Sequence, residues 1–368
     1  MTTTTTTPNA TATTTTTGLI LAIDLGKYKS VACRYAGPDA VMFESFTTDR
    51  SRLRKLLEHT RPAVVVIEAC LLAGWAHDLC AELGLVCKVA NTASDAWKFK
   101  HLKRKTDRDD ALRLAQLQAL GQLPAVCLPP PPTRQWRALI AYRQTLVGRR
   151  VAVQNRIRAL FVAQGLPAPR GAAAWAKAGL EGLAAQARPL AECGADELWR
   201  GLLHSALAEY RHLVGLLDCA EGRLDELAKQ DQGVQLLETT PGVGPRTAEA
   251  IVAHLHQPER FQSGKQVSAY VGLVPKQFQS GETDRRGRIT RRGPALLRKL
   301  LVECAWVMLR YNGWARAVYL RLTHGGKARK KQAIVALARK LLVRCWAMLR
   351  DQKPWRDQTP APAAATPT

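Results

Sequence analysis

The chain has 368 residues, of which 46% are hydrophobic and 23% charged, so it is long enough for two or three folded domains and is not a disordered chain. Its 54 Lys and Arg residues outnumber 30 Asp and Glu residues, which gives a net charge of +24 at pH 7. This excess favours a nucleic-acid partner, because Lys and Arg neutralise phosphates and release counterions. Charge alone leaves open a basic soluble protein without such a partner.

The sequence shows no pattern typical of a membrane span, a secretory signal, a disulfide framework or a zinc site. No apolar run approaches the ~20 residues needed to cross a bilayer, so we expect no membrane association. The Thr-rich residues 1–17 lack the features of a secretory signal and are expected to form a disordered tail. The nine cysteines include no CxxC pair, and the eight histidines form no HExxH, so neither a disulfide framework nor a zinc site is predicted. These signs predict a cytoplasmic protein.

The first expected domain spans residues 18–128. Short apolar runs predict buried strands, and segments of helical character lie between them. In chain order we expect strands at 19–23, 28–35 and 40–46, a helix at 50–59, a strand at 63–67, a helix at 71–83, a strand at 85–89 and a helix at 107–120. Three consecutive strands followed by alternating helix and strand predict a mixed α/β sheet.

A proline run marks a linker at 129–132, and the chain beyond it reads as helical. Apolar residues recur every three or four positions over 136–161 and 203–227, which predicts two long amphipathic helices within a coiled-coil arm at 129–232. The arm either folds back within one chain or pairs between chains. We expect a mostly α domain at 233–350 and a disordered tail at 351–368.

Four acidic residues stand at positions where they can meet. Asp24 ends the first strand, Glu68 ends the strand at 63–67, and Asp107 and Asp110 share one face at the start of a helix. Converging carboxylates repel unless cations are bound, and their hard oxygens select Mg²⁺ or Mn²⁺. Two such ions promote phosphodiester cleavage. Asp109 points off this face, and each acid taken singly is also compatible with a helix cap or a solvated side chain.

Three clusters of basic residues are candidates for nucleic-acid binding, with a solvated surface as the alternative for each. The first leads into the acidic helix and consists of Lys98, Lys100, Lys103, Arg104, Lys105 and Arg108. The second lies in a stretch without acidic residues and consists of Arg285, Arg286, Arg288, Arg291 and Arg292. The third precedes another predicted helix and consists of Lys327, Arg329, Lys330 and Lys331.

Two turns of the C-terminal domain also suit phosphate chemistry. Gly242 and Gly244 lie in a turn that opens a helix, where exposed backbone N–H groups suit a DNA phosphate, as in a helix-hairpin-helix element. Ser280 precedes a glycine and an Arg-rich Gly loop, and this pattern resembles a hydroxyl nucleophile set among phosphate clamps. Ordinary turns are the alternative for both.

Two sets of motifs, in the same order along the chain, resemble one known family. The first resembles a DEDD domain of the RuvC type and consists of Asp24, Ile67-Glu68-Ala69, Lys105-Thr106-Asp107 and Asp110-Ala111. The second resembles a C-terminal transposase domain and consists of Pro241-Gly242-Val243-Gly244, Gly272-Leu273-Val274-Pro275, Ser280-Gly281 and the run from Gly287 to Gly293. The family is the insertion-sequence family numbered one-hundred-and-ten, whose members are bridge-RNA-guided serine recombinases.

The resemblance implies an RNase H-like fold with Asp24, Glu68, Asp107 and Asp110 around Mg²⁺. It also implies that Ser280 attacks a DNA phosphate and holds the strand as a phosphoserine intermediate. The implied partners are donor and target DNA, a structured guide RNA encoded by the element, and further copies of the chain, from a dimer to a tetramer with composite sites. The setting would be the bacterial cytoplasm, associated with the nucleoid. Gln279 departs from relatives that carry a second serine before the Ser-Gly pair.

Three functions are compatible with these residues. A DNA recombinase that excises and inserts its own element explains both motif sets. A metal-dependent endonuclease of the Holliday-junction resolvase type would use the acids without Ser280, and the Arg-rich C-terminal domain disfavours it. A non-catalytic nucleic-acid-binding regulator would use only the basic surfaces, and the presence of all four acids disfavours it.

Overall fold

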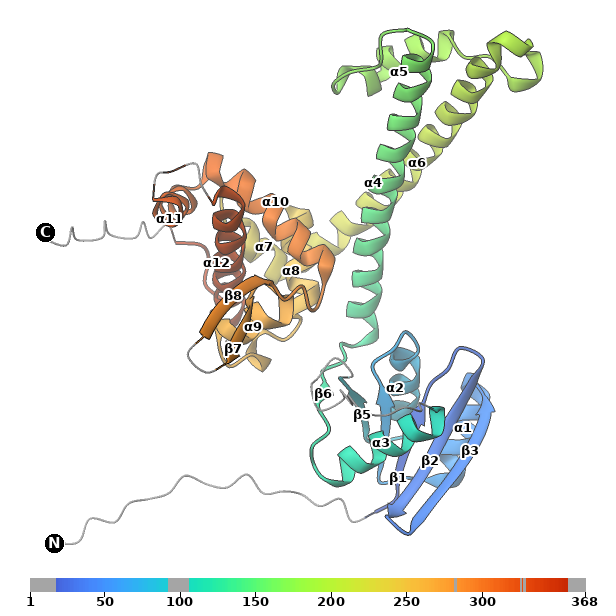
Figure 1. The fold of residues 1–368 in the computed structure, drawn as a ribbon, viewed down its shortest axis with the longest axis vertical. Helices are drawn as coiled ribbons and strands as arrows, with labels where there is room; N and C mark the ends of the chain where they lie inside the picture. Colours follow the sequence, from blue (N-terminus) through green and yellow to red (C-terminus); the bar gives the residue numbers. More distant parts are fainter. Residues whose placement is uncertain (1–17, 92–105, 281–282, 325, 327–328, 357–368) are drawn as a thin grey trace, which may run out of the picture. The chain divides into compact units, whose positions relative to one another are not determined.

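The computed structural model describes residues 18–91, 106–280, 283–324, 326 and 329–356, apart from the side chains of 283, 284 and 286 (Figure 1). The chain divides into two compact units, Met1–Pro131 and Pro132–Thr368. Within the described residues, no helix combines the length and the apolar character needed to cross a membrane.

A six-stranded mixed sheet forms the first unit, with strand order β3-β2-β1-β4-β5-β6. The strands are β1 Ile20–Asp24, β2 Lys29–Gly37, β3 Ala40–Thr47, β4 Val64–Glu68, β5 Cys87–Ala90 and β6 Ala125–Val126. β1, β4 and β5 run parallel, while β2, β3 and β6 pair antiparallel to their neighbours. The predicted mixed sheet is confirmed. β6 was not predicted, because two residues are too few to show a period.

Helices cover both faces of this sheet, since successive strand residues point to opposite sides. Leu21 and Ile23 of β1 pack in one cluster with α1 Arg50–Thr60 and α2 Ala73–Glu82. Ile20 and Ala22 pack on the other face against α3 Asp107–Ala119. The three predicted helices are confirmed within about two residues at each end. Because strand residues point alternately to the two faces of the sheet, only every second side chain at a strand end can face α3.

Two 33-residue helices, α4 Pro131–Ala163 and α6 Leu198–Gln230, form the arm of the second unit (Figure 1). They pack antiparallel within one chain, because Arg143 pairs with Glu221 at 2.6 Å and Arg156 pairs with Glu209 at 2.8 Å. Their apolar stripes share one core cluster. α5 Lys177–Ala185 and three short 3₁₀ turns connect them. Within the single chain, the two arm helices therefore pack against each other.

The remainder of the second unit is mostly helical, as expected, with one β-hairpin. Its elements are α7 Gln232–Glu238, α8 Pro245–Leu255, a 3₁₀ turn at Pro258–Arg260, α9 Gly264–Val271, β7 Pro275–Ser280, β8 Thr283–Ile289, α10 Ala295–Tyr311, α11 Gly313–Thr323 and α12 Lys330–Asp351. One core joins these helices and includes Ile140 and Leu224 of the arm. The arm and the C-terminal part therefore belong to one compact unit.

The Arg-rich segment after Ser280 is not the loop that the sequence suggested. Most of it is strand β8, which pairs antiparallel with β7 so that Ser280 lies opposite Thr283. Every residue of β7 is exposed. Sequence periodicity could not signal this hairpin, because a strand without a buried face shows no alternation of apolar and polar residues.

The expected start of the C-terminal tail at 351 is also wrong. Asp351 ends α12, and the chain that follows returns to the core. Trp355 packs edge-on against Trp314, with ring centroids 5.3 Å apart, and its backbone N–H donates to Thr239 Oγ1 at 3.0 Å. Two aromatic side chains and a hydrogen bond thus hold residues that composition alone assigned to a tail.

Two motif glycines have a structural role in this unit. Gly272 ends α9 with φ of 75°, and Gly293 has φ of 72°, a region that other residues enter only with strain. A Cβ on Gly272 would lie 2.2 Å from the carbonyl oxygen of Arg292, and one on Gly293 would lie 2.0 Å from that of Tyr270. Arg298 then donates to the carbonyls of Val271, Arg292 and Gly293. The two glycines therefore allow the Arg-rich segment to press against the end of α9.

Candidate active site and nucleic-acid surfaces

Asp24 and Glu68 lie at matching ends of adjacent parallel strands. The register of β1 and β4 pairs Ile23 with Ile67, so the two acids follow at the same level. Asp24 lies two residues after Ala22, and Glu68 lies two residues after Val66. Ala22 and Val66 are buried against α3, so both acids face the α3 side of the sheet. Both are partly exposed. The fold thus brings these two carboxylates to one edge of the sheet.

The first turn of α3 brings two more acids to the same face. Asp107 and Asp110 are three residues apart, and Leu114, which is buried against β1 and β4, follows them at spacings of seven and four, so all three share one face of the helix. Asp109 points elsewhere: its carboxylate accepts from the Thr106 hydroxyl at 2.6 Å, while the Thr106 side chain caps the helix. Thr106 fixes where α3 begins and therefore where Asp107 and Asp110 lie along the sheet edge.

The four carboxylates approach one edge without closing into a preformed cluster. Among the residues that the structure describes, no group of three or more His, Cys, Asp or Glu side chains is arranged to hold a metal ion. Mutual repulsion of like charges gives a physical reason for such a spread. The donors offered at this edge are all carboxylate oxygens on rigid strand ends and one helix turn, and this is the donor type that Mg²⁺ and Mn²⁺ take.

Most of the first basic cluster lies outside the described residues. Lys98, Lys100, Lys103, Arg104 and Lys105 belong to the segment 92–105. Arg108 is exposed on α3, and its guanidinium lies over the ring of Phe43, 5.6 Å from the centroid. Of the predicted phosphate-binding residues around the acids, Arg108 alone can be placed, beside the acidic turn of α3.

The two glycines of the α7–α8 turn differ in their surroundings. Gly242 has φ of 93°, and a Cβ there would lie 2.9 Å from Cγ of Met308 on α10; its carbonyl accepts from Cys304 Sγ at 3.2 Å. Gly244 caps α8 and is exposed with open space around it. Gly242 therefore seats the turn on α10, and Gly244 leaves room for a backbone phosphate to approach.

Ser280 is exposed at the last position of β7, at the end of the hairpin. Arg285, Arg288, Arg291 and Arg292 are also exposed, and Arg291 adopts a left-handed conformation with φ of 58°. The side chain of Arg286 lies outside the described residues. The hydroxyl thus lies on a strongly basic hairpin and the segment that follows it.

The third basic cluster borders the start of α12. Lys327 lies outside the described residues, whereas Arg329, Lys330 and Lys331 are exposed there. Cations are unfavourable at a helix N-terminus, because the helix dipole places partial positive charge at that end. Their position therefore costs some helix stability and leaves their charge available to an anion.

Sequence reasoning missed a buried ionic cluster where α8 meets the arm. Glu249 is 1% exposed, and its Oε1 lies 3.4 Å from a guanidinium nitrogen of Arg246, which also pairs with Asp225 of α6. Burial raises the pKa of Glu249 to about 7; Arg246 and Arg143 oppose the shift, while Asp225 and Glu221 add to it. No sequence signal marks this residue, because its burial depends on the docking of α6.

We expect stability to fall with rising pH because of this carboxyl. Since the native pKa is raised from 4.5 to about 7, the native state holds a proton that the unfolded state has released. The stabilisation is complete below about pH 4.5 and is lost as pH rises through about 7. Glu249→Gln should therefore gain up to about 3 kcal/mol relative to wild type between pH 5 and 8, measured by denaturant unfolding. Exposed Glu226→Gln is the control, and parallel pH curves for wild type and Glu249→Gln would contradict the assignment.

Two family models match this chain. The model described as "Transposase IS116/IS110/IS902 family" matches residues 234–320, and the DEDD model of the IS110 elements, described as "Transposase", matches residues 21–163. Together they cover more than half of the chain, in the order of the two motif sets. The chain belongs to the IS110 family of transposases. The matched regions hold all four acids and Ser280.

Individual relatives agree with this membership. The transposase of insertion sequence element IS1111A from Coxiella burnetii is 27% identical over 345 residues, covering 92% of this chain and 91% of its own. The pilin gene-inverting protein of Moraxella bovis is 34% identical over 123 residues, or 33% of this chain and 38% of its own. The solved RuvC structure of Thermus thermophilus is 17% identical and covers 29% of this chain and 99% of its own, with a TM-score of 0.21.

Membership of the IS110 family makes the protein an enzyme that cleaves and rejoins DNA. DNA is its substrate, and the DEDD match together with the mixed sheet supports the expected RuvC-like N-terminal domain. DEDD nucleases of this kind generally depend on a divalent metal. A DNA substrate is consistent with the basic composition of the chain.

Proposed function

We propose that this IS110-family transposase is a site-specific recombinase in which Asp24, Glu68, Asp107 and Asp110 bind Mg²⁺ and Ser280 is the nucleophile. One observation carries the proposal for the acids. Adjacent parallel strands end in Asp24 and Glu68 on the sheet face that α3 covers, and the first turn of α3 presents Asp107 and Asp110. Four carboxylates at one sheet edge supply the hard oxygen donors that a divalent metal takes.

The proposed metal would lower the free energy of the transition state by offsetting charge that develops on the phosphate oxygens. The chain itself holds the four carboxylates in fixed positions. The β1 and β4 backbones hold Asp24 and Glu68, and the Thr106 cap holds the start of α3. Among the basic residues near the acids, we propose that exposed Arg108 binds DNA backbone, together with Lys98, Lys100, Lys103, Arg104 and Lys105, which lie outside the described residues.

In the proposed step, Oγ of Ser280 forms a bond to a DNA phosphorus, and the deoxyribose oxygen leaves as a hydroxyl. The strand is then held as a phosphoserine ester. Attack by a hydroxyl of another DNA end forms the new phosphodiester and releases serine, so no external energy source is needed. The exposed hairpin position of Ser280 leaves access for a strand, and Arg285, Arg288, Arg291 and Arg292 would bind the flanking phosphates.

The remaining partners follow from the family resemblance. We propose that a structured guide RNA encoded by the element selects donor and target DNA, while the protein binds mainly backbone through Gly244, Arg329, Lys330 and Lys331, with Gly242 seating the turn. Lys327 is included in this surface on its sequence position. We also propose assembly into dimers and tetramers in the bacterial cytoplasm at the nucleoid. The relative that bears the name of a pilin gene-inverting protein favours a conservative rejoining reaction.

The test combines purified protein, RNA transcribed from the regions flanking the element, junction DNA labelled at one end, and Mg²⁺. We expect a protein–DNA adduct on a denaturing gel that disappears on protease digestion and requires both RNA and metal. Cleavage that depends on metal but yields no adduct would support the resolvase-like endonuclease in its place. Binding without cleavage under any of these conditions would support a regulator.

A further inference from the structure

Two cysteines of the first unit face each other where the chain passes from α2 into β5. Cys80 lies in the last turn of α2, on the buried face that also carries Ala76, and is 1% exposed. Cys87 is the first residue of β5 and is partly exposed. Both pack in the hydrophobic cluster on the α1 and α2 side of the sheet. Two elements that are consecutive in the chain therefore bring two thiols to one face of the sheet.

The short connection between α2 and β5 holds these side chains together. The backbone N–H of Leu85 donates to the carbonyl oxygen of Cys80 at 2.8 Å, which closes the turn after the helix. Leu85 and Cys87 are two residues apart as the chain enters β5, and both pack against the cluster that contains Cys80. The thiols of Cys80 and Cys87 are hydrogen-bonded to each other. Because both residues lie at the ends of their elements, small backbone adjustments are enough to bring the two sulfurs to bonding distance.

The contact between the two sulfurs also favours ionisation of one of them. The hydrogen bond from the Cys87 thiol holds the pKa of Cys80 below its usual value, although burial opposes the shift. The thiolate is the form of cysteine that reacts with oxidants and with disulfides. Cys87 is partly exposed, so the pair borders solvent on one side. The pair thus combines a stabilised thiolate with a second sulfur in contact with it.

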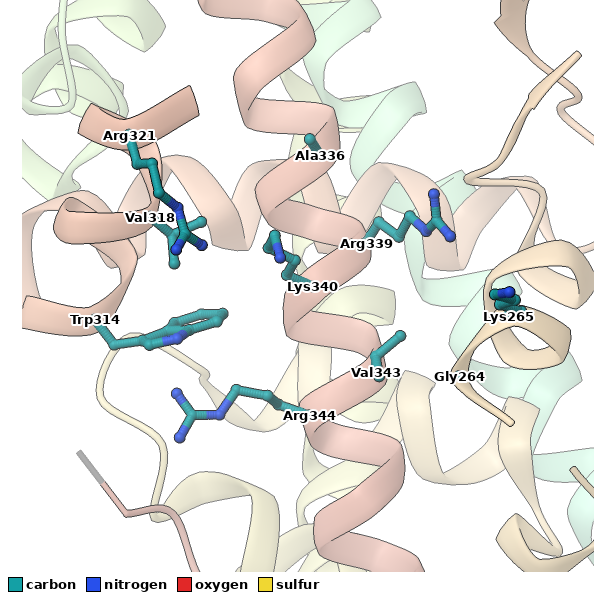
Figure 2. A pocket seen from close by; sticks show the side chains of 10 residues that line it. All are labelled: Gly264, Lys265, Trp314, Val318, Arg321, Ala336, Arg339, Lys340, Val343 and Arg344. Carbon is teal, nitrogen blue, oxygen red and sulfur yellow. The ribbon is translucent and has the colours of Figure 1, made fainter. Parts of the chain in front are cut away.

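A second pair of nearby cysteines, in the other unit, lacks these features. Cys304 and Cys345 are both buried in the core that joins α10 and α12. Val343 and Arg344 line a pocket of about 810 Å³ between α9, α11 and α12, but Cys345, the next residue, is 0% exposed (Figure 2). Burial raises the pKa of Cys304 to about 12, and its Sγ donates to the carbonyl oxygen of Gly242 at 3.2 Å. This pair therefore serves as an internal comparison that oxidants should not reach.

We propose that Cys80 and Cys87 form a reversible disulfide when the protein meets a peroxide. One thiolate attacks an oxygen of hydrogen peroxide, the O–O bond breaks, and a sulfenic acid forms as the first water leaves. The second sulfur then forms the S–S bond and displaces the hydroxyl group, which leaves as a second water. The two thiols lose two electrons and two protons in total, and the peroxide takes up both. Thiol reductants reverse the reaction, as is typical of redox-sensing disulfides in reducing compartments.

The test treats the folded full chain with hydrogen peroxide, blocks free thiols with an alkylating agent and maps the peptides by mass spectrometry. Proteases that cut after Glu68, Glu82 and Lys88 separate residues 69–82 from residues 83–88, so the two peptides stay joined only through a disulfide. We expect the joined peptides to appear with peroxide and to vanish with dithiothreitol. At the dose that links half of the pair, exposed Cys219 should be oxidised about 10-fold less, because thiolate reactivity follows pKa.

Two variants assign the joined peptides to the correct sulfurs. Cys70 also lies in the peptide 69–82, so Cys70→Ser is the matched control and should keep the joined peptides. Cys87→Ser changes one atom of a partly exposed side chain and should fold as wild type does, which circular dichroism checks. It should lose the joined peptides and leave Cys80 free for alkylation after unfolding. Cys304 and Cys345 should stay reduced in every sample as long as the chain is folded.

Two results would overturn the inference. One is that Cys80 and Cys87 both remain free at a peroxide dose that oxidises Cys219. The other is that the joined peptides disappear in Cys70→Ser, which would place the link on the wrong cysteine. The inference stands apart from the proposed function, because the recombination chemistry uses no cysteine and the adduct assay runs equally well in reducing buffer.

Discussion

Ser280→Ala is expected to abolish the covalent protein–DNA adduct, with a loss in strand cleavage of about 10⁶-fold, as for removal of a serine nucleophile in a hydrolase. Ser280 is exposed at the end of β7, where alanine keeps the backbone pairing with Thr283 and removes only one hydroxyl. Folding and affinity for RNA and DNA should therefore be unchanged. The measurement is adduct yield on a denaturing gel, with binding followed by gel shift.

The control for this variant is Thr283→Ala, which removes a hydroxyl from the opposite strand of the same hairpin. We expect it to form the adduct at near wild-type yield. An adduct that survives in Ser280→Ala would reject this serine as the nucleophile. Peptide mapping of the adduct would then identify the attacking residue, and Gln279 leaves no second serine directly before the Ser-Gly pair.

Asp24→Asn should lower strand cleavage by about 10³-fold, because a metal-bound phosphate gains several kcal/mol of charge stabilisation in the transition state. The substitution preserves size and changes only charge at the end of β1, so the sheet should remain intact. Metal-dependent thermal stabilisation should weaken in parallel, since a ligand that binds only the native state raises its stability. Both quantities are measured over a Mg²⁺ and Mn²⁺ titration.

Two matched acids give the controls. Asp39→Asn changes an exposed acid in the β2–β3 turn, and Asp109→Asn changes the acid beside Asp110 that is engaged with Thr106. Both should retain activity within a few-fold, whereas Asp110→Asn should behave like Asp24→Asn. Full recombination by Asp24→Asn would refute the metal site, and a large loss in Asp109→Asn would show that the wrong neighbour had been assigned.

The local elements of the first unit could be predicted because their signals are local. A five-residue apolar run between polar residues predicts a buried strand, so the residues that end such runs, Asp24 and Glu68, were identified without coordinates. Thr106 followed by an acidic first turn likewise predicts where α3 begins. That these strands are neighbours in one parallel pair depended on contacts between distant segments, which periodicity does not encode.

The arm shows what local sequence patterns determine and what only tertiary contacts determine. Apolar spacings of three and four predict two long helices, but the same stripe serves an intrachain hairpin or an intermolecular coiled coil. The tertiary structure decides in favour of the hairpin for the single chain, since Arg143 with Glu221 and Arg156 with Glu209 pair in antiparallel order. The β7–β8 hairpin had no alternation of apolar and polar residues to signal it, since every residue of β7 is exposed.

The amino-acid sequence by itself was sufficient to predict the family, the mixed α/β first domain and the candidate acids. Motifs and hydrophobic periods are properties of residues that are close together in the sequence. Packing alone decided the burial of Glu249, the return of Trp355 to the core and the pocket between α9, α11 and α12. Lys265, Arg321 and Arg339 are far apart along the chain and come together only where α9, α11 and α12 pack. Basic residues that are dispersed in the sequence reach one surface only when the helices that carry them pack together.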